Sequence, residues 1–220
     1  MTLSQIKTAS IASGAVDTAQ LAADAVDNTI LDLTDDFAFT GTVSGAGGLV
    51  LLNTVTLDNN TTASVTFDET YINSTYDNYV ITIHWQVETD SQKLAARFLE
   101  TGGTEISDSN YARNIGSNYY SIFATGEDHL EISQNVGTGG GGNEKGAYAQ
   151  WFLNMKDSDN FQPSIVGQVM LGNTANNLVQ QLTAGKYKGS TDVTGGIKFY
   201  NHGGANFSSG SQFKLYGMTQ

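Results

Sequence analysis

The chain carries two different patterns of apolar and polar positions, and they meet near residue 48. In residues 1–33 six aliphatic residues stand five positions apart in succession. They are Ile6, Ile11, Val16, Leu21, Val26 and Leu31. A helix would return an apolar residue every three or four positions, and a strand every two. The five-residue period therefore predicts neither a solvent-exposed helix nor a strand.

The same segment also repeats every ten residues. "SIASGAVDTA" (10–19) aligns with "QLAADAVDNT" (20–29), and Leu31 begins a third copy. Burying one aliphatic side chain contributes roughly 1.5–3 kcal/mol, whereas ordering one backbone residue costs about 1–2 kcal/mol. One buried side chain for every five ordered residues cannot stabilise such a segment alone. The segment therefore needs either a partner surface or further copies of itself.

Three ordered conformations compete for residues 1–33, with disorder as a fourth alternative. On a helix, successive apolar residues would lie about 140° apart around the axis, which forms no stripe. A solenoid with five-residue sides would complete only about one and a half coils, and solenoids need about three repeats. A parallel homo-oligomer, in which each chain turns every fifth residue toward a shared axis, satisfies the pattern best. We therefore predict a stem that is shared between chains.

Residues 34–47 are a candidate connector. Their sequence is "TDDFAFTGTVSGAG", in which Gly41, Gly45 and Gly47 interrupt any regular pattern. Phe37 and Phe39 are suited to anchoring this connector to the segment that follows.

From Leu49 onward the period changes to two. In "NYVITIHWQVE" (78–88) one face is apolar and the other is mostly polar, with Val80 as the exception. The apolar face consists of Tyr79, Ile81, Ile83, Trp85 and Val87. Similar alternation occurs in "TASVTF", "KLAARFL", "AYAQWFLNM", "SIVGQVML", "GGIKFY" and "QFKLYGM". With weaker candidates near 49–57, 118–124, 129–134 and 177–183, the pattern predicts about ten strands.

Strands with one apolar and one polar face, joined by short turns rich in Gly, Asn, Asp and Ser, are typical of antiparallel sheets. We therefore predict that residues 48–220 form an all-β domain, an antiparallel β-sandwich of the jelly-roll type. Trp85 and Trp151 are expected in its core.

The net charge of −12, with ten Lys and Arg residues, excludes nucleic acid and an anionic membrane surface as expected partners. The chain has no cysteine, which excludes disulfides and thiolate metal sites. The N-terminus lacks the apolar core of a signal peptide, and no stretch is long and apolar enough to insert in a bilayer.

No motif predicts catalysis, a metal or a cofactor. "GTGGGGNEKG" (137–146) contains G-x-G-x-x-G, but a predicted strand follows it, and a phosphate site needs a helix there. His84, His129 and His202 lack the spacing of a zinc motif. "KDSDN" (156–160) lacks the glycine and distal glutamate of a calcium loop, and no G-x-S-x-G sequence occurs.

Aromatic residues at predicted loops or solvent-facing strand positions are the remaining candidates for a ligand site or a subunit interface. They are Tyr111, Tyr119, Tyr120, Tyr148, Phe152, Tyr200 and Tyr216. Flat rings beside Asn, Asp and Gln suit stacking on sugars, but tyrosine is also enriched at subunit interfaces. We favour the interface.

"IASGAVDTAQLAADAVDNTIL" resembles the N-terminal repeats of virion fibre proteins of tailed bacteriophages, particularly those of marine and cyanobacterial phages. In such proteins a glycine-rich connector follows, and then a β-domain with segments similar to "STYDNYVITI" (74–83) and "FKLYGM" (213–218). All three features occur here in that order.

The resemblance implies a non-enzymatic structural protein of the virion, a homotrimer with an N-terminal stem and a C-terminal head. The stem would also dock onto another virion protein, and the head could bind a glycan of the host surface. The short stem leaves two variants open, a tail fibre and a head fibre or capsid decoration protein without a receptor. A polysaccharide depolymerase is the alternative from another class, although residues 49–220 show no repeated coils of a parallel β-helix.

Overall fold

The computed structural model describes residues 48–117, 121–137, 147–155, 162–173, 175, 177–189 and 195–218. These residues form an all-β structure without a helix, so they include no helix that could cross a membrane. The twelve strands are β1 (Leu49–Thr56), β2 (Ser64–Asp68), β3 (Asn78–Trp85), β4 (Leu94–Leu99), β5 (Tyr111–Ser117), β6 (Ser121–Glu127), β7 (Leu130–Glu131), β8 (Ala147–Asn154), β9 (Ser164–Gly172), β10 (Leu178–Tyr187), β11 (Gly196–Asn201) and β12 (Gln212–Met218).

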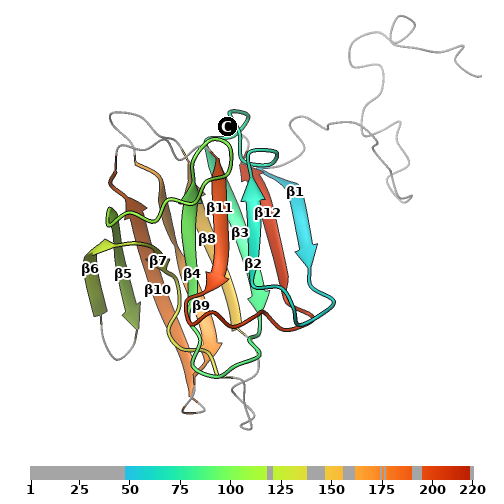
Figure 1. Cartoon of the computed structure of the whole chain (residues 1–220), viewed down its shortest axis with the longest axis vertical. Coiled ribbons are helices and arrows are strands. Elements are labelled where there is room, and N and C mark those ends of the chain that lie inside the picture. Colours follow the sequence, from blue (N-terminus) through green and yellow to red (C-terminus); the bar gives the residue numbers. More distant parts are fainter. Residues whose placement is uncertain are drawn as a thin grey trace, which may run out of the picture. The chain divides into compact units, whose positions relative to one another are not determined.

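The strands form two antiparallel sheets. The larger sheet has eight strands in the order β1-β12-β3-β8-β9-β10-β5-β6, and the smaller has four in the order β2-β11-β4-β7. Figure 1 shows β2, β4 and β11 in front of the strands of the larger sheet. From β1 to β4 the chain changes sheet at every strand, as it does again over β7–β8 and β11–β12.

Two hairpins account for the difference in size between the sheets. Without β5–β6 and β9–β10, the two sheets read β1-β12-β3-β8 and β2-β11-β4-β7, which is the strand order of an eight-stranded jelly roll. The inserted strands all join the large sheet, where β9 pairs with β8 and β10 pairs with β5. The insertions therefore double the width of one sheet.

The core lies between the sheets because the apolar side of each strand faces inward. Tyr79, Ile81 and Ile83 of β3 are fully buried, and Trp85 and Trp151 are buried as predicted. The Phe199 ring of β11 and the Phe213 ring of β12 lie 6.1 Å apart, which joins the two sheets in a single apolar cluster. The predicted antiparallel two-sheet architecture is thus confirmed for the described residues.

The prediction was wrong at β5, which we did not identify as a strand. Tyr111 was expected at a solvent-facing position, but it is fully buried. Its hydroxyl donates to the Ile106 carbonyl and accepts from the Phe98 amide, each at 3.0 Å. Arg113, also on β5, is only 11% exposed, with Nη2 2.9 Å from the Glu131 carboxylate. A buried arginine between apolar residues conceals the alternation of this strand.

Candidate functional site

The most unusual surface of the described residues is the outer face of the eight-stranded sheet. Large apolar side chains normally point inward, yet several on this sheet are exposed to solvent. They are Leu49, Leu51, Phe123, Tyr148, Phe152, Val166, Met170, Leu178 and Leu182. All of them lie on strands of the large sheet, namely β1, β6, β8, β9 and β10.

The strand registers arrange many of these side chains in one line. Starting at the β1 edge, each residue is paired with the next across the sheet, and we call this line the apolar row. It consists of Leu51, Tyr216, Val80, Phe152, Val166, Ala184, Asn114 and Phe123. Seven of its eight members are apolar or aromatic, and such cross-strand neighbours contact one another on the same face.

Four large side chains of the row are exposed to solvent. Leu51 is 54% exposed, Phe152 50%, Val166 55% and Phe123 72%. Val80, between Tyr216 and Phe152 in the register, is buried even though it faces outward. The row is thus exposed at Leu51, Phe152, Val166 and Phe123 and covered at Val80.

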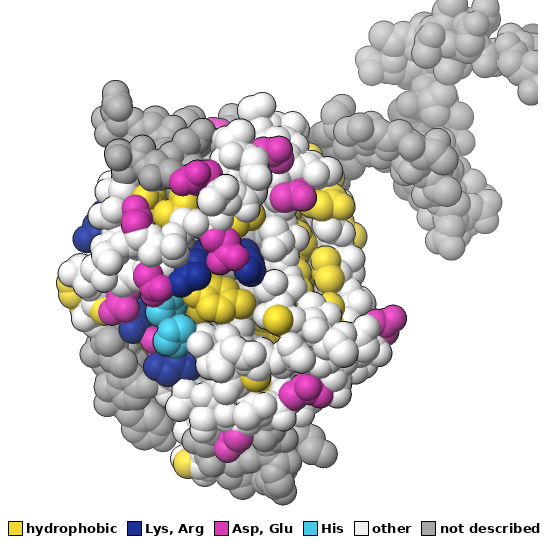
Figure 2. Space-filling view, in the orientation of Figure 1, with side chains coloured by type: hydrophobic (Ala, Val, Ile, Leu, Met, Phe, Trp, Pro, Cys, Tyr) yellow, Lys and Arg dark blue, Asp and Glu magenta, His cyan; other side chains and the backbone are white. Residues whose placement is uncertain are grey.

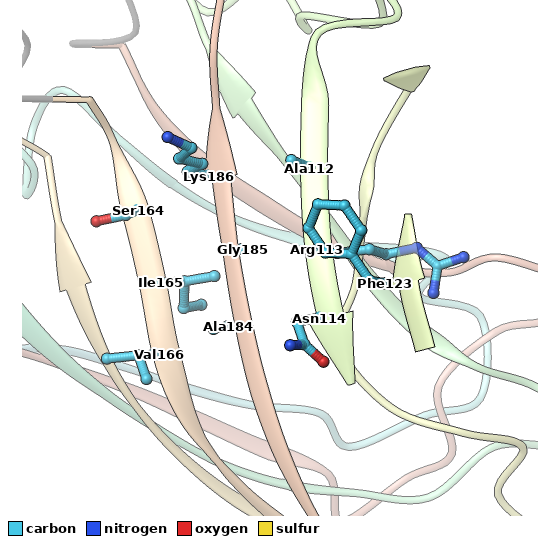
Figure 3. A pocket seen from close by; sticks show the side chains of 10 residues that line it. All are labelled: Ala112, Arg113, Asn114, Phe123, Ser164, Ile165, Val166, Ala184, Gly185 and Lys186. Atoms are coloured by element: carbon cyan, nitrogen blue, oxygen red, sulfur yellow. The ribbon is translucent and has the colours of Figure 1, made fainter. Parts of the chain in front are cut away.

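A hollow of about 320 Å³ interrupts the face toward the β6 edge. Its floor is formed around Ala184 and Gly185, and the small outward side chain of Ala184 leaves the space between Val166 and Asn114 unfilled. Figure 3 shows Ser164 and Val166 on one side of β10, and Asn114 and Phe123 on the other. The hollow is mainly apolar and could receive an aliphatic or aromatic side chain.

The face also lacks acidic residues. Among the eight strands of the large sheet, the only carboxylate is Glu127, the last residue of β6, and its Oε1 lies 3.8 Å from Arg113. The chain as a whole has 22 Asp and Glu residues and a net charge of −12. Acidic residues are thus concentrated outside this sheet.

The four-stranded sheet carries a contrasting polar group on its outer face, which we call the Arg97 cluster. It consists of Arg97, Glu105, Asp128, Lys198 and Tyr200. Arg97 bonds Asp128 at 2.6 Å and Glu105 at 3.4 Å, and Lys198 also bonds Glu105. The Arg97 guanidinium lies 5.3 Å from the centre of the Tyr200 ring. Figure 2 shows basic, acidic and histidine side chains gathered on this side of the molecule.

The histidine side chains next to this cluster are those of His129 and His202. Their rings are stacked with centres 4.3 Å apart, and His129 Nδ1 lies 2.6 Å from the Asp128 carboxylate. Burial lowers the pKa of His202 below its ordinary value, and the neighbouring His129 lowers it further. No group of three or more potential metal-binding side chains occurs in the described ranges.

In the Arg97 cluster each positive side chain contacts a negative one directly. The hydrogen bond from Lys198 holds the pKa of Glu105 below its usual value, and His129 does the same for the pKa of Asp128. Both carboxylates come from outside the strands of the small sheet. The cluster therefore fastens the segments around residues 105 and 128 onto this sheet.

The seven aromatic residues predicted as a ligand site or subunit interface do not form one surface. Tyr148, Phe152 and Tyr216 lie on the outer face of the large sheet, whereas Tyr200 lies on the small sheet in the Arg97 cluster. Tyr111 belongs to the core. Tyr119 and Tyr120, like the predicted connector and the stem residues Ile6, Ile11, Val16, Leu21, Val26 and Leu31, lie outside the described residues.

Sequence reasoning missed the aliphatic members of the exposed face. Leu51, Val166, Met170 and Leu182 were counted only as parts of strands. Their signal was present, since each stands at an outward position of an alternating strand, where a polar residue is expected.

A comparison with models of known protein families and with curated proteins finds no match.

Proposed function

We propose that this chain is a structural virion protein of the fibre type from a tailed bacteriophage, without enzymatic activity. Three copies share one axis along residues 1–33, and the same stem attaches the protein to another protein of the particle. The all-β domain of residues 48–220 faces outward and is free to contact the host surface.

One observation carries this proposal, namely the five-residue apolar period of residues 6–31. A single chain gains too little from one buried side chain per five residues to order such a segment. Three parallel copies solve the problem, because each buries its apolar residues against the other two. The head adds support, since its large sheet offers an apolar surface that a structural assembly can use.

Light scattering of the purified full-length chain tests the proposal. We expect a particle of three times the chain mass of 23.4 kDa. A monomer at micromolar concentration would contradict the shared axis, and with it the fibre assignment.

The short stem favours a second candidate within the same class, a head fibre or capsid decoration protein without a receptor. Labelling the protein on intact particles separates the two. Label at the tail supports a tail fibre, whereas label at the capsid vertices or faces supports the second candidate.

A polysaccharide depolymerase is the candidate from a different class, and it has a direct test. We expect that incubation of the purified protein with envelope polysaccharide of the host releases no new reducing ends. Their release would refute the non-enzymatic assignment.

A further inference from the structure

We infer that the outer face of the eight-stranded sheet is the surface through which copies of this chain pack against each other, so that the trimer continues from the stem into the head. This inference rests on the proposed homotrimer and identifies a contact surface that the stem pattern does not specify.

The residue types on this face are those of an interface centre. Interface centres are depleted in Lys, Glu and Asp, and are enriched in aromatic residues and Met. The outward positions of the large sheet hold Tyr148, Phe152, Met170 and Phe123 with several aliphatic side chains. Uncharged polar residues such as Gln150 and Gln168 lie between them, and Lys186 is one of the few cations of this face. The outer face of the small sheet, with its paired charges in the Arg97 cluster, has the opposite character.

The charge distribution favours a second copy of this chain as the occupant. Each copy carries a net charge of −12, so copies repel one another wherever acidic surfaces meet. The face that is free of carboxylates is where this repulsion is weakest. A partner chosen by charge attraction would need cations or anions to contact, and the apolar row offers neither.

The face is large enough to contribute to assembly beside the stem. Eight strands about 4.8 Å apart, each about 24 Å long, span on the order of 800 Å², the area that one partner contributes to a standard interface, and a three-fold arrangement divides this area between two neighbours. A glycan site would be smaller and would combine aromatic rings with hydrogen-bonding groups. The apolar row consists of aliphatic and aromatic side chains with Asn114 as its single amide, and the amides Gln150 and Gln168 of this face lie in the neighbouring row.

The two halves of the face differ, as a three-fold assembly requires. In a closed ring of three, each contact joins two different patches. Leu49 and Leu51 project at the β1 edge, whereas the hollow above Ala184 lies toward the β6 edge. The half near β1 can therefore contact one neighbour around the axis, and the half with the hollow can contact the other.

Thiol labelling of the full-length chain tests the inference, because the natural chain has no cysteine to interfere. Val166→Cys places one thiol in the centre of the apolar row. Thr66→Cys is the matched control, since Thr66 is an exposed strand position on the outer face of the small sheet. We expect a maleimide reagent to modify Val166→Cys at least tenfold more slowly than Thr66→Cys. Met170→Cys, on the same face as Val166, serves if Val166→Cys does not fold.

Light scattering on the same samples makes each outcome decisive. The inference is supported if the protein is a trimer and maleimide modifies the thiol at residue 166 slowly and the thiol at residue 66 rapidly. A trimer in which both thiols react equally fast overturns it and leaves the proposed function intact, since the stem alone would then hold the copies. A monomer refutes the proposed function itself. If added host polysaccharide, rather than assembly, slows the thiol at residue 166, the face binds a glycan and the inference is wrong.

Discussion

At the scale of single residues, Tyr200 is notable because its environment disfavours ionisation of its hydroxyl. Its hydroxyl is buried, and no group in the described part of the chain forms a hydrogen bond with it. Burial raises the pKa of Tyr200 to about 12, even though the nearby Arg97 guanidinium favours the phenolate. The folded protein therefore favours the neutral hydroxyl of Tyr200 over the phenolate.

This environment predicts a loss of stability at alkaline pH. A raised pKa gives a contribution that is complete below the ordinary value of 10.0 and is lost as the pH rises through the folded value of about 12. We expect Tyr200→Phe to lose less of its free energy of unfolding between pH 8 and pH 11 than the wild type. Denaturant unfolding at both pH values measures this, and equal losses in the two proteins would refute it.

Glu131 shows how a buried charge is compensated in the same region. Its side chain is 5% exposed and is bonded by Lys93 and by Arg113, each at 2.9 Å. Removing either cation would leave the buried carboxylate with one partner instead of two, which is costly. Because Arg113 belongs to β5 and Glu131 to β7, this contact joins the extended edge of the large sheet to the edge of the small sheet.

At the scale of strands, the pairing of β8 with β9 depends on one glycine. Gly167 pairs with Trp151, whose ring covers the space where a side chain at position 167 would lie. A Cβ added there would overlap the carbonyl oxygen of Gln150 and the Trp151 ring. The Trp151 ring therefore packs directly against the backbone of Gly167, where no side chain intervenes.

We expect Gly167→Ala to reduce the free energy of unfolding by about 1–3 kcal/mol through overpacking. Gly116→Ala is the matched control, because Gly116 also lies in a strand of this sheet and a Cβ there would meet no atom within 4 Å. Thermal or denaturant unfolding of both variants makes the comparison. A Gly116→Ala variant that is as unstable as Gly167→Ala would mean that the contact with Trp151 is not the cause.

At the scale of the whole molecule, the proposed trimer would rest on two surfaces of different kinds. The stem pattern offers one apolar residue in five, whereas the head offers the apolar row of its large sheet. If both contribute, weakening one should loosen the trimer without unfolding the head, because the head has its own core.

The substitution Val16→Asp tests the stem directly. Three copies of Val16 at one axis would become three carboxylates in an apolar environment, where like charges add to the cost of burial. We expect Val16→Asp to loosen the trimer or to block its incorporation into particles. Asp17→Ala, at a polar position of the repeat, should change stability by no more than about 0.5 kcal/mol. Light scattering compares them, and equal effects would mean that the five-residue step does not mark the inward face.

The sequence by itself determined the local pattern of the head. Alternation of apolar and polar residues placed Tyr79, Ile81, Trp85 and Trp151 in the core, because every second residue of a strand faces the same side. It failed where charge is buried, as at β5, since Arg113 interrupts the apolar side and finds its compensation in Glu131 only after folding. Tyr111 was misplaced for the same reason.

The tertiary structure alone decided which strands are neighbours. Leu51 and Phe123 stand at opposite ends of the apolar row and are 72 positions apart in sequence, and the sequence analysis treated each only as part of a weakly predicted strand. Alternation reveals the face of a side chain but not the order of the strands, which depends on long-range pairing. The apolar row, the hollow beside it and the grouping of charges on the other sheet arise from that order, since it brings scattered residues into one surface.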